Sequence, residues 1–144
     1  MSTVFKTQVD IAAPPEKVFA YFIEAEKMVR WMGDFARLQA VEGGEFTVDI
    51  NGVLIRGHYV SLVPFSRLEI TWGELGNLAM LPGSTRVVIE LAPSATGTSL
   101  TLSQFGLSAE EEVKHAMGWP HYMGRLAELA ERRDPGVDPF APVI

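Results

Sequence analysis

The chain has 144 residues, of which 47% are hydrophobic and 21% charged, and it contains no cysteine. A chain of this length and composition folds as one domain with a sizeable core, which excludes general disorder; the lack of cysteine excludes a disulfide scaffold, a thiolate nucleophile and a Cys-ligated zinc site. Its net charge of −6 offers no basic surface to phosphates or anionic lipids, so we expect no nucleic-acid or membrane partner.

The N-terminal region predicts a strand followed by two short helices. Residues 3–11 alternate apolar and polar side chains, as in a half-buried strand, and the pair Pro14-Pro15 ends this pattern. Residues 16–24 place apolar side chains on one helical face, and residues 25–31 predict a second short helix. The N-terminus does not resemble a secretory signal, and no apolar run approaches the ~20 residues that span a bilayer. We therefore expect a cytoplasmic protein.

From residue 36 onward, tight turns separate short segments with alternating apolar side chains. The Asn-Gly pair at 51–52 is the strongest short hairpin signal, and a Gly-Gly pair at 43–44 marks another turn. Together with the N-terminal strand, these segments predict a seven-stranded antiparallel sheet. The expected strands after the helices are residues 36–41, 45–50, 53–63, 67–72, 85–91 and 98–105.

The segment between the last two hairpins has helix-forming residues and glycines but no clear period. We predict that residues 73–83 form a loop, of which residues 76–83 make a flap with exposed Leu78, Met80 and Leu81. Such a flap either closes over a ligand or covers the mouth of the domain as a structural element.

The last large element is a long helix. Ser108 and Glu111 have the spacing of a capping box, and Arg132-Arg133 place positive charge at the helix end. Pro120 lacks an N–H, so we expect it to bend the helix or split it in two. The domain spans residues 1–133 and leaves residues 134–144 as a tail with three prolines. The apolar end of this tail either packs against a second copy in a homodimer or is frayed.

Scattered residues across positions 4–130 resemble the START-like (SRPBCC) superfamily, in the branch related to the C-terminal domain of the heat-shock-protein-90 ATPase activator. Among them are Ile11-Ala-Ala-Pro14, Trp31, Gly43-Gly44-Glu-Phe46, Thr71-Trp72 and Gly118-Trp119. The resemblance implies an α+β helix-grip fold, in which a curved seven-stranded antiparallel sheet, two short helices and a long C-terminal helix surround a cavity. This superfamily includes lipid carriers, hormone receptors, polyketide cyclases and co-chaperone domains, so the fold alone does not decide the function.

A cavity between sheet and helix commonly holds one apolar ligand, which a few polar groups orient. For any single aromatic residue the alternative is plain core packing, but three tryptophans on separate elements favour a broad internal space. The expected ligand-binding residues are Trp31, Phe46, Tyr59, Trp72, Gln104, His115, Met117, Trp119 and Met123.

Two polar positions limit the chemistry. Gln104 is expected to point inward, where the family often has histidine, and to bond to the helix, to a trapped water or to a ligand; glutamine cannot act as a base at neutral pH. The three histidines, His58, His115 and His121, lack the spacing of a metal pair, so we expect no metal and no cofactor.

These observations support three hypotheses about function. The first is non-catalytic binding of a small, mostly apolar molecule in the cavity. The second is an enzyme of polyketide-cyclase or hydrolase type, with His115 or Tyr59 as the proton carrier. The third is a co-chaperone-like module that binds a partner protein, such as a chaperone, through its surface.

Overall fold

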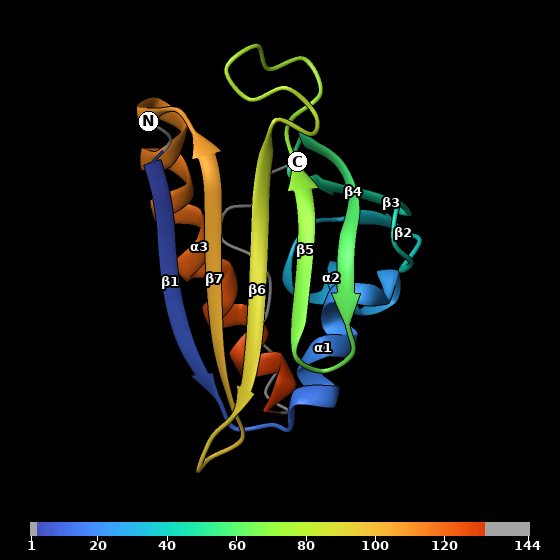
Figure 1. Ribbon diagram of the computed structural model, residues 1–144, viewed down its shortest axis with the longest axis vertical. Coiled ribbons are helices and arrows are strands. Elements are labelled where there is room, and N and C mark those ends of the chain that lie inside the picture. Colours follow the sequence, from blue (N-terminus) through green and yellow to red (C-terminus); the bar gives the residue numbers. More distant parts are fainter. Residues whose placement is uncertain (1–2, 132–144) are drawn as a thin grey trace.

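Seven strands form one antiparallel sheet in the computed structural model, which describes residues 3–131. The strand order is β1-β7-β6-β5-β4-β3-β2, so β2 to β7 form a meander and β1 pairs with the last strand (Figure 1). The strands are β1 (Thr3–Ile11), β2 (Phe35–Leu38), β3 (Glu45–Ile50), β4 (Val53–Val63), β5 (Arg67–Trp72), β6 (Thr85–Pro93) and β7 (Thr98–Leu107).

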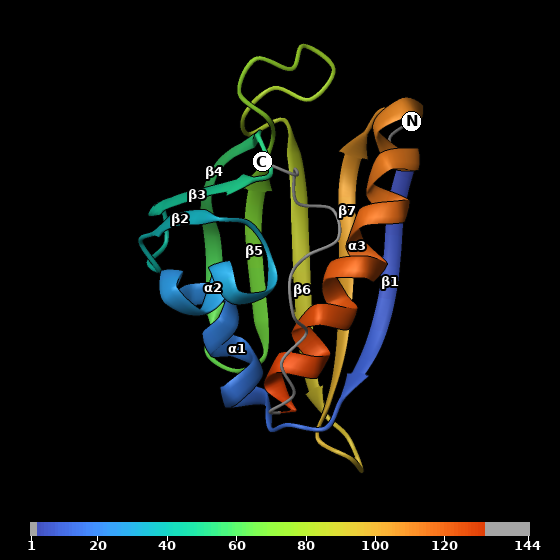
Figure 2. The same ribbon diagram turned by 180° about the vertical axis from the view of Figure 1, so that it is seen from behind.

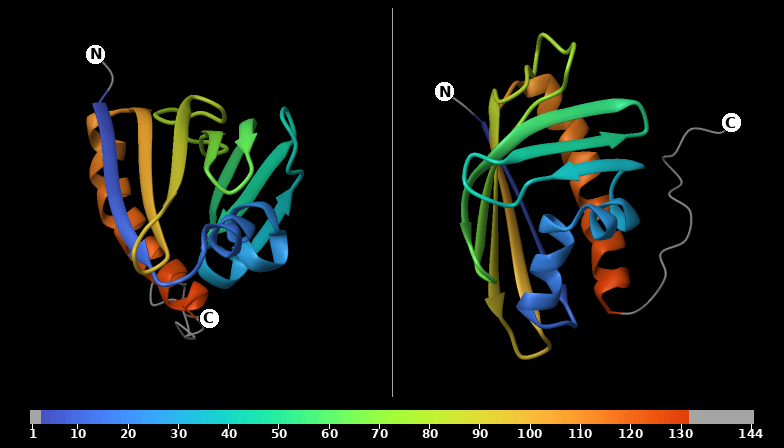
Figure 3. Two further views of the ribbon diagram at one scale, coloured as in Figure 1. Left: turned by 60° about the horizontal axis from the view of Figure 1, so that its bottom comes forward. Right: turned by 90° about the vertical axis from the view of Figure 1, so that its right-hand side faces the viewer.

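Three helices cover one face of this sheet. They are α1 (Pro15–Ile23), α2 (Ala25–Trp31) and α3 (Ala109–Ala130). Seen from behind, α3 runs obliquely past β7 and β1, whereas α1 and α2 lie near the other end of the sheet (Figure 2). The sheet curves, and β2 to β4 curl toward the face that carries the helices (Figure 3). The predicted α+β helix-grip architecture is therefore confirmed.

Turn chemistry explains why the element bounds follow the sequence so closely. At the β3–β4 turn, Asn51 and Gly52 have φ values of 51° and 90°, which is the left-handed region that a two-residue hairpin requires. Strand β2 ends at Leu38, before the expected residue 41. The reason is a local turn, in which the Gly44 N–H donates to the Val41 carbonyl.

Helix α3 begins as the sequence predicts. The Ser108 side chain accepts a hydrogen bond from the Glu111 N–H at 3.2 Å. The expected split at Pro120 is wrong, because α3 is one helix over its whole length. Both Pro120 and Ala116, whose carbonyl loses its partner, are exposed, so that carbonyl can turn toward water. The predicted positive end at Arg132-Arg133 and the tail lie outside the described residues.

Replacing Ser108 with alanine is expected to lower the free energy of unfolding by about 1 kcal/mol, because α3 loses its N-cap acceptor. Urea unfolding measures this change. Asparagine at the same position restores the acceptor and should recover most of the loss. A Ser108→Asn variant as unstable as Ser108→Ala would contradict the capping role.

The core lies between the concave face of the sheet and the three helices, and among the described residues every buried polar side-chain atom except Trp72 Nε1 has a hydrogen-bond partner. Thr98, on β7, is fully buried and donates to the Ala13 carbonyl at 2.7 Å, which ties the sheet to the segment before α1. Among residues 3–131, no helix is long and apolar enough to cross a membrane. The largest fully buried side chains are Trp31, Tyr59, Phe22, Phe46, Ile11 and Met28.

Candidate functional site

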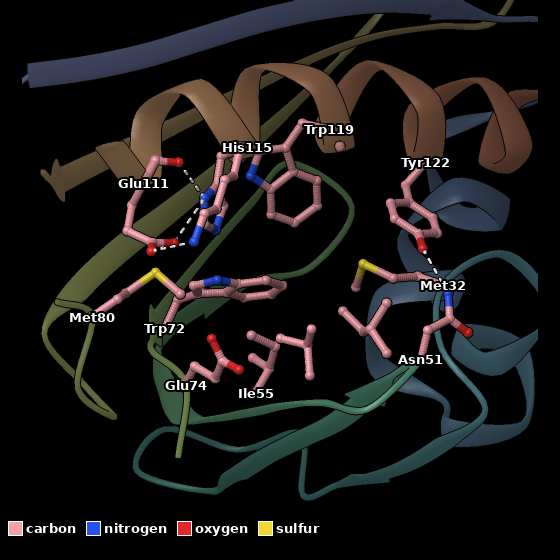
Figure 4. A pocket seen from close by; sticks show the side chains of 14 residues that line it. Met32, Asn51, Ile55, Trp72, Glu74, Met80, Glu111, His115, Trp119 and Tyr122 are labelled. Carbon is pink, nitrogen blue, oxygen red and sulfur yellow. Dashed lines mark hydrogen bonds and ion pairs between the residues drawn. The ribbon is translucent and has the colours of Figure 1, made fainter. Parts of the chain in front are cut away.

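A pocket of about 500 Å³ lies between α3 and the curled part of the sheet, with the loop after β5 at its edge. Side chains from α3 point into it from one side, and side chains of β4, β5 and the β3–β4 turn face them (Figure 4). Its volume falls within the range typical of small-molecule sites. The lining residues are Met32, Ile50, Asn51, Val53, Ile55, Trp72, Glu74, Met80, Glu111, Lys114, His115, Gly118, Trp119 and Tyr122.

Three of the residues that the sequence predicts for the site meet in this lining. Trp72 comes from β5, whereas His115 and Trp119 come from successive turns of α3. The ring centroids of Trp72 and Trp119 are 5.0 Å apart, and those of Trp72 and His115 are 6.5 Å apart in an edge-to-face arrangement. Two large aromatic faces thus form one wall of the pocket.

A buried hydrogen-bond chain fixes the orientation of Trp119. Its Nε1–H donates to Gln104 Oε1 at 2.7 Å, and Gln104 Nε2 donates to Thr85 Oγ1 at 3.0 Å. The Thr85 hydroxyl in turn donates to the Trp72 carbonyl at 2.7 Å. Gln104 is fully buried and outside the pocket lining, so its inward orientation and its bond to the helix are confirmed. Gln104 therefore holds the Trp119 indole in place from outside the pocket.

Four other residues from the predicted set lie in the packed core, outside the pocket lining. Trp31 packs edge-to-face on Phe22 and donates from Nε1 to the Tyr21 carbonyl at 3.1 Å. Tyr59 packs against Phe46. Met123 is also buried and completes this group of four with Trp31, Phe46 and Tyr59.

Tyr59 does not fit the predicted alternative role of proton carrier. Its hydroxyl donates to the Phe22 carbonyl at 2.9 Å, and its side chain is fully buried. Burial raises the pKa of the Tyr59 phenol far above its ordinary value, because the charged form would lose its hydration. This hydroxyl is a structural group that attaches β4 to α1.

Met117 was expected in the wall, and the structure corrects this. Its side chain is 70% exposed, because the face of α3 that carries it points away from the pocket. The residue beside it, Gly118, lines the pocket instead. A one-residue step turns a helix by about 100°, which moves a side chain from one face to another.

One end of the pocket is polar, and we call Glu74, Glu111, Lys114 and His115 its polar end. The Glu111 carboxylate is buried, although the sequence indicated only a capping role for this residue. It accepts from Lys114 Nζ at 3.2 Å and from Asn77 Nδ2 at 3.4 Å. The hydrogen bond to Glu111 raises the pKa of Lys114. The sequence signal for this polar end is the spacing of Glu111 and His115, because two residues four apart lie on the same face of a helix.

The loop after β5 contributes Met80 to the pocket, which corrects its expected exposure. Met80 is only 2% exposed, whereas Leu78 at the tip is 90% exposed. The Glu74 N–H donates to the Met80 carbonyl at 2.7 Å, and Asn77 Nδ2 donates to Glu74 Oε1 at 3.0 Å. These bonds close the loop on itself and bring the Met80 thioether beside Trp72 (Figure 4).

Within residues 3–131, no cluster of three His, Asp or Glu side chains could hold a metal ion. The chemistry of the lining is instead that of an apolar cavity with one polar end. One buried polar atom stands out, because Trp72 Nε1 has no hydrogen-bond partner among the described residues. A sequence pattern cannot reveal such an atom, since it depends on how the indole packs.

Residues 12–131 match the family model described as activator of Hsp90 ATPase homolog 1-like protein. A comparison with curated proteins finds no match.

Three solved structures illustrate the likeness. The AHSA1-like protein RHE_CH02687 from Rhizobium etli is 41% identical, with a TM-score of 0.79, covering 100% of this chain and 91% of its own. Protein MLL2253 from Mesorhizobium loti is 23% identical with a TM-score of 0.82, covering 92% and 99% respectively. The Aha1 dimer from Colwellia psychrerythraea is 17% identical with a TM-score of 0.77, covering 90% and 96%. The last two likenesses show the fold alone.

Proposed function

The chain belongs to the family of activator of Hsp90 ATPase homolog 1-like proteins, and from that premise we propose that it binds a small, mostly apolar molecule in the pocket under α3, without catalysis. The observation that carries the proposal is the pocket of about 500 Å³ with two tryptophan faces along one wall. Aromatic and aliphatic linings of this size favour apolar ligands, because burying apolar surface contributes about 25 cal/mol per Å².

The wall is also preorganised for binding. The bonds from Trp119 to Gln104 and from Gln104 to Thr85 fix the indole before any ligand arrives. A ligand then loses less free energy to the ordering of side chains than it would against a mobile wall. The rigidity of this wall supports a binding role over a merely incomplete core.

Two glycines of α3 allow a matched test of the proposal. A Cβ at Gly118 or at Gly124 would meet nothing within 4 Å, but only Gly118 lines the pocket. Gly118→Leu should fill part of the cavity and weaken binding of N-phenyl-1-naphthylamine, a neutral fluorescent probe, by about tenfold or more. Gly124→Leu should leave the affinity unchanged. Both variants should unfold at a urea concentration at least as high as the wild type does, because leucine is a better helix former than glycine.

Fluorescence titration of the three proteins decides the outcome. If the probe does not bind the wild type, or if both variants bind it equally well, the pocket is not a ligand site. If the probe binds the wild type and Gly118→Leu weakens it, native mass spectrometry of the protein from its own cells identifies the natural ligand as a co-purified small molecule that is lost in Gly118→Leu.

Catalysis in the same pocket is a second candidate, and His115 is the group that favours it. Its ring lines the pocket, with Nδ1 bonded at 2.8 Å to the Glu111 carbonyl. A fixed imidazole in a cavity suits general base chemistry. An enzyme would turn over the co-purified molecule and lose that turnover in His115→Ala while keeping its affinity. Binding without turnover would remove this candidate.

Interaction with another protein is a third candidate, which rests on the outer face of α3. Val113 and Met117 lie one turn apart there and are 64% and 70% exposed. Exposed apolar side chains of this kind often mark an interaction surface for a chaperone or a second copy. In a pull-down and in analytical ultracentrifugation, a Val113→Ser/Met117→Ser variant would lose such a partner. An unchanged result would remove this candidate.

A further inference from the structure

The polar end of the pocket contains a buried hydrogen-bond donor with no acceptor. Trp72 is only 4% exposed, and its Nε1–H has no partner within residues 3–131. Burying an indole N–H without an acceptor is unfavourable, because the group gives up its hydrogen bond to water and gains none in return. Figure 4 shows the indole nitrogen in the part of the pocket that His115 enters. A ligand that displaces a neighbouring side chain and places an acceptor atom here would recover the lost interaction.

His115 Nε2, at the same end of the pocket, is a hydrogen-bond acceptor. His115 Nδ1 lies 2.8 Å from the Glu111 carbonyl oxygen, and a carbonyl can only accept, so Nδ1 carries the proton. In the neutral ring, Nε2 then has a lone pair, and among the described residues the polar contacts of this ring, to the carbonyl and the carboxylate of Glu111, are both made by Nδ1. The pocket thus presents one donor and one acceptor from two neighbouring rings.

From these two atoms we propose that the ligand carries a hydroxyl group, a phenol or an alcohol on an apolar body, which accepts from Trp72 Nε1 and donates to His115 Nε2. The two rings are neighbours, with their centroids 6.5 Å apart in an edge-to-face arrangement, so both atoms belong to the same end of the pocket. This inference rests on the proposed binding function and specifies the chemistry of the ligand.

The charges at the polar end argue against a charged group on the ligand. Glu74 and Glu111 carry two carboxylates, and Lys114, the one lysine in the lining, is already bonded to Glu111 at 3.2 Å. A carboxylate ligand would meet an excess of negative charge here. An ammonium group could not accept from the Trp72 N–H. A neutral hydroxyl satisfies both free atoms without adding charge.

Three probes of nearly equal shape test the inference at neutral pH. Naphthalene offers no hydrogen-bonding group, 2-methoxynaphthalene offers an acceptor only, and 2-naphthol offers both an acceptor and a donor. By competition against N-phenyl-1-naphthylamine, 2-naphthol should bind about fivefold more tightly than the methoxy compound, since one hydrogen bond is worth about 1 kcal/mol. In NMR spectra, the Trp72 indole N–H signal, identified by its loss in Trp72→Phe, should shift downfield with 2-naphthol and not with naphthalene.

Two variants test the contributions of His115 and Trp72 to ligand binding one at a time. His115→Phe keeps a ring beside Trp72 and should abolish the preference for 2-naphthol over the methoxy compound. Trp72→Phe removes the donor and should reduce the preference for the methoxy compound over naphthalene. Binding of naphthalene to both variants shows that they fold and keep the pocket.

The possible results have distinct meanings. Equal affinity for all three probes would overturn the hydroxyl inference and leave apolar binding intact. Equal affinity for 2-naphthol and the methoxy compound, both above naphthalene, would overturn the role of His115. Failure of every probe to bind the wild type would remove the proposed function itself.

Discussion

Gly57→Ala is expected to lower the free energy of unfolding by about 3 kcal/mol or more, the largest effect of any substitution considered. A Cβ at this position of β4 would lie 1.9 Å from the Thr71 carbonyl oxygen and 2.6 Å from its carbon, both in the backbone of β5. A backbone cannot rotate away as a side chain can, so the two strands must separate locally. The pocket would open along its β4 and β5 wall, and probe affinity should fall with stability.

Gly124→Ala provides the control for this prediction. A Cβ there meets nothing within 4 Å, so alanine removes only the helix penalty of glycine and should stabilise the protein by up to about 1 kcal/mol. Urea unfolding of both variants shows whether Gly57→Ala lowers the free energy of unfolding and Gly124→Ala raises it. A Gly57→Ala protein with the wild-type unfolding midpoint would mean that β4 and β5 are not in this close contact.

Gln104→Leu is expected to destabilise the fold by about 2 kcal/mol, because Trp119 Nε1 loses its buried acceptor while the volume stays similar. The Trp119 indole would then be free to leave its position in the wall. We therefore also expect weaker binding of N-phenyl-1-naphthylamine. Unfolding in urea and a fluorescence titration measure the two effects.

A double-mutant cycle with Trp119→Phe identifies the cause. Phenylalanine has no N–H to leave unpaired, so Gln104→Leu should cost about 1–2 kcal/mol less in the Trp119→Phe background than in the wild type. Equal costs in both backgrounds would show that the bond from Trp119 to Gln104 does not stabilise the wall.

Much of the fold could be predicted because local chemistry and tertiary structure agree. The Asn51-Gly52 turn, the Ser108 cap and the alternating strands each depend on neighbours in the sequence, and the structure has them at the expected positions. Pro120 was the exception. Its local penalty predicted a bend or a split, and α3 is not split, because packing of its buried face keeps the helix whole.

The pocket lining was harder to predict, since it depends on angles between distant elements. Gln104 could be placed inward by strand alternation, and Trp119 by helical period. Met117 and Gly118 differ by one residue, and only the observed rotation of α3 shows that the glycine faces the cavity. The buried carboxylate of Glu111 was missed for a similar reason, because its capping position explained it without a pocket.

The contrast between the two ends of the cavity has a consequence for selectivity. Trp119 is fastened to the sheet through Gln104, whereas Met32, near Tyr122 and Asn51 at the end away from Met80, has an unbranched, rotatable thioether (Figure 4). The aromatic wall therefore keeps a fixed shape, whereas the end of the pocket at Met32 can adapt to the ligand. Ligands that carry the same hydroxyl group but differ in bulk at the Met32 end should therefore bind with similar affinity.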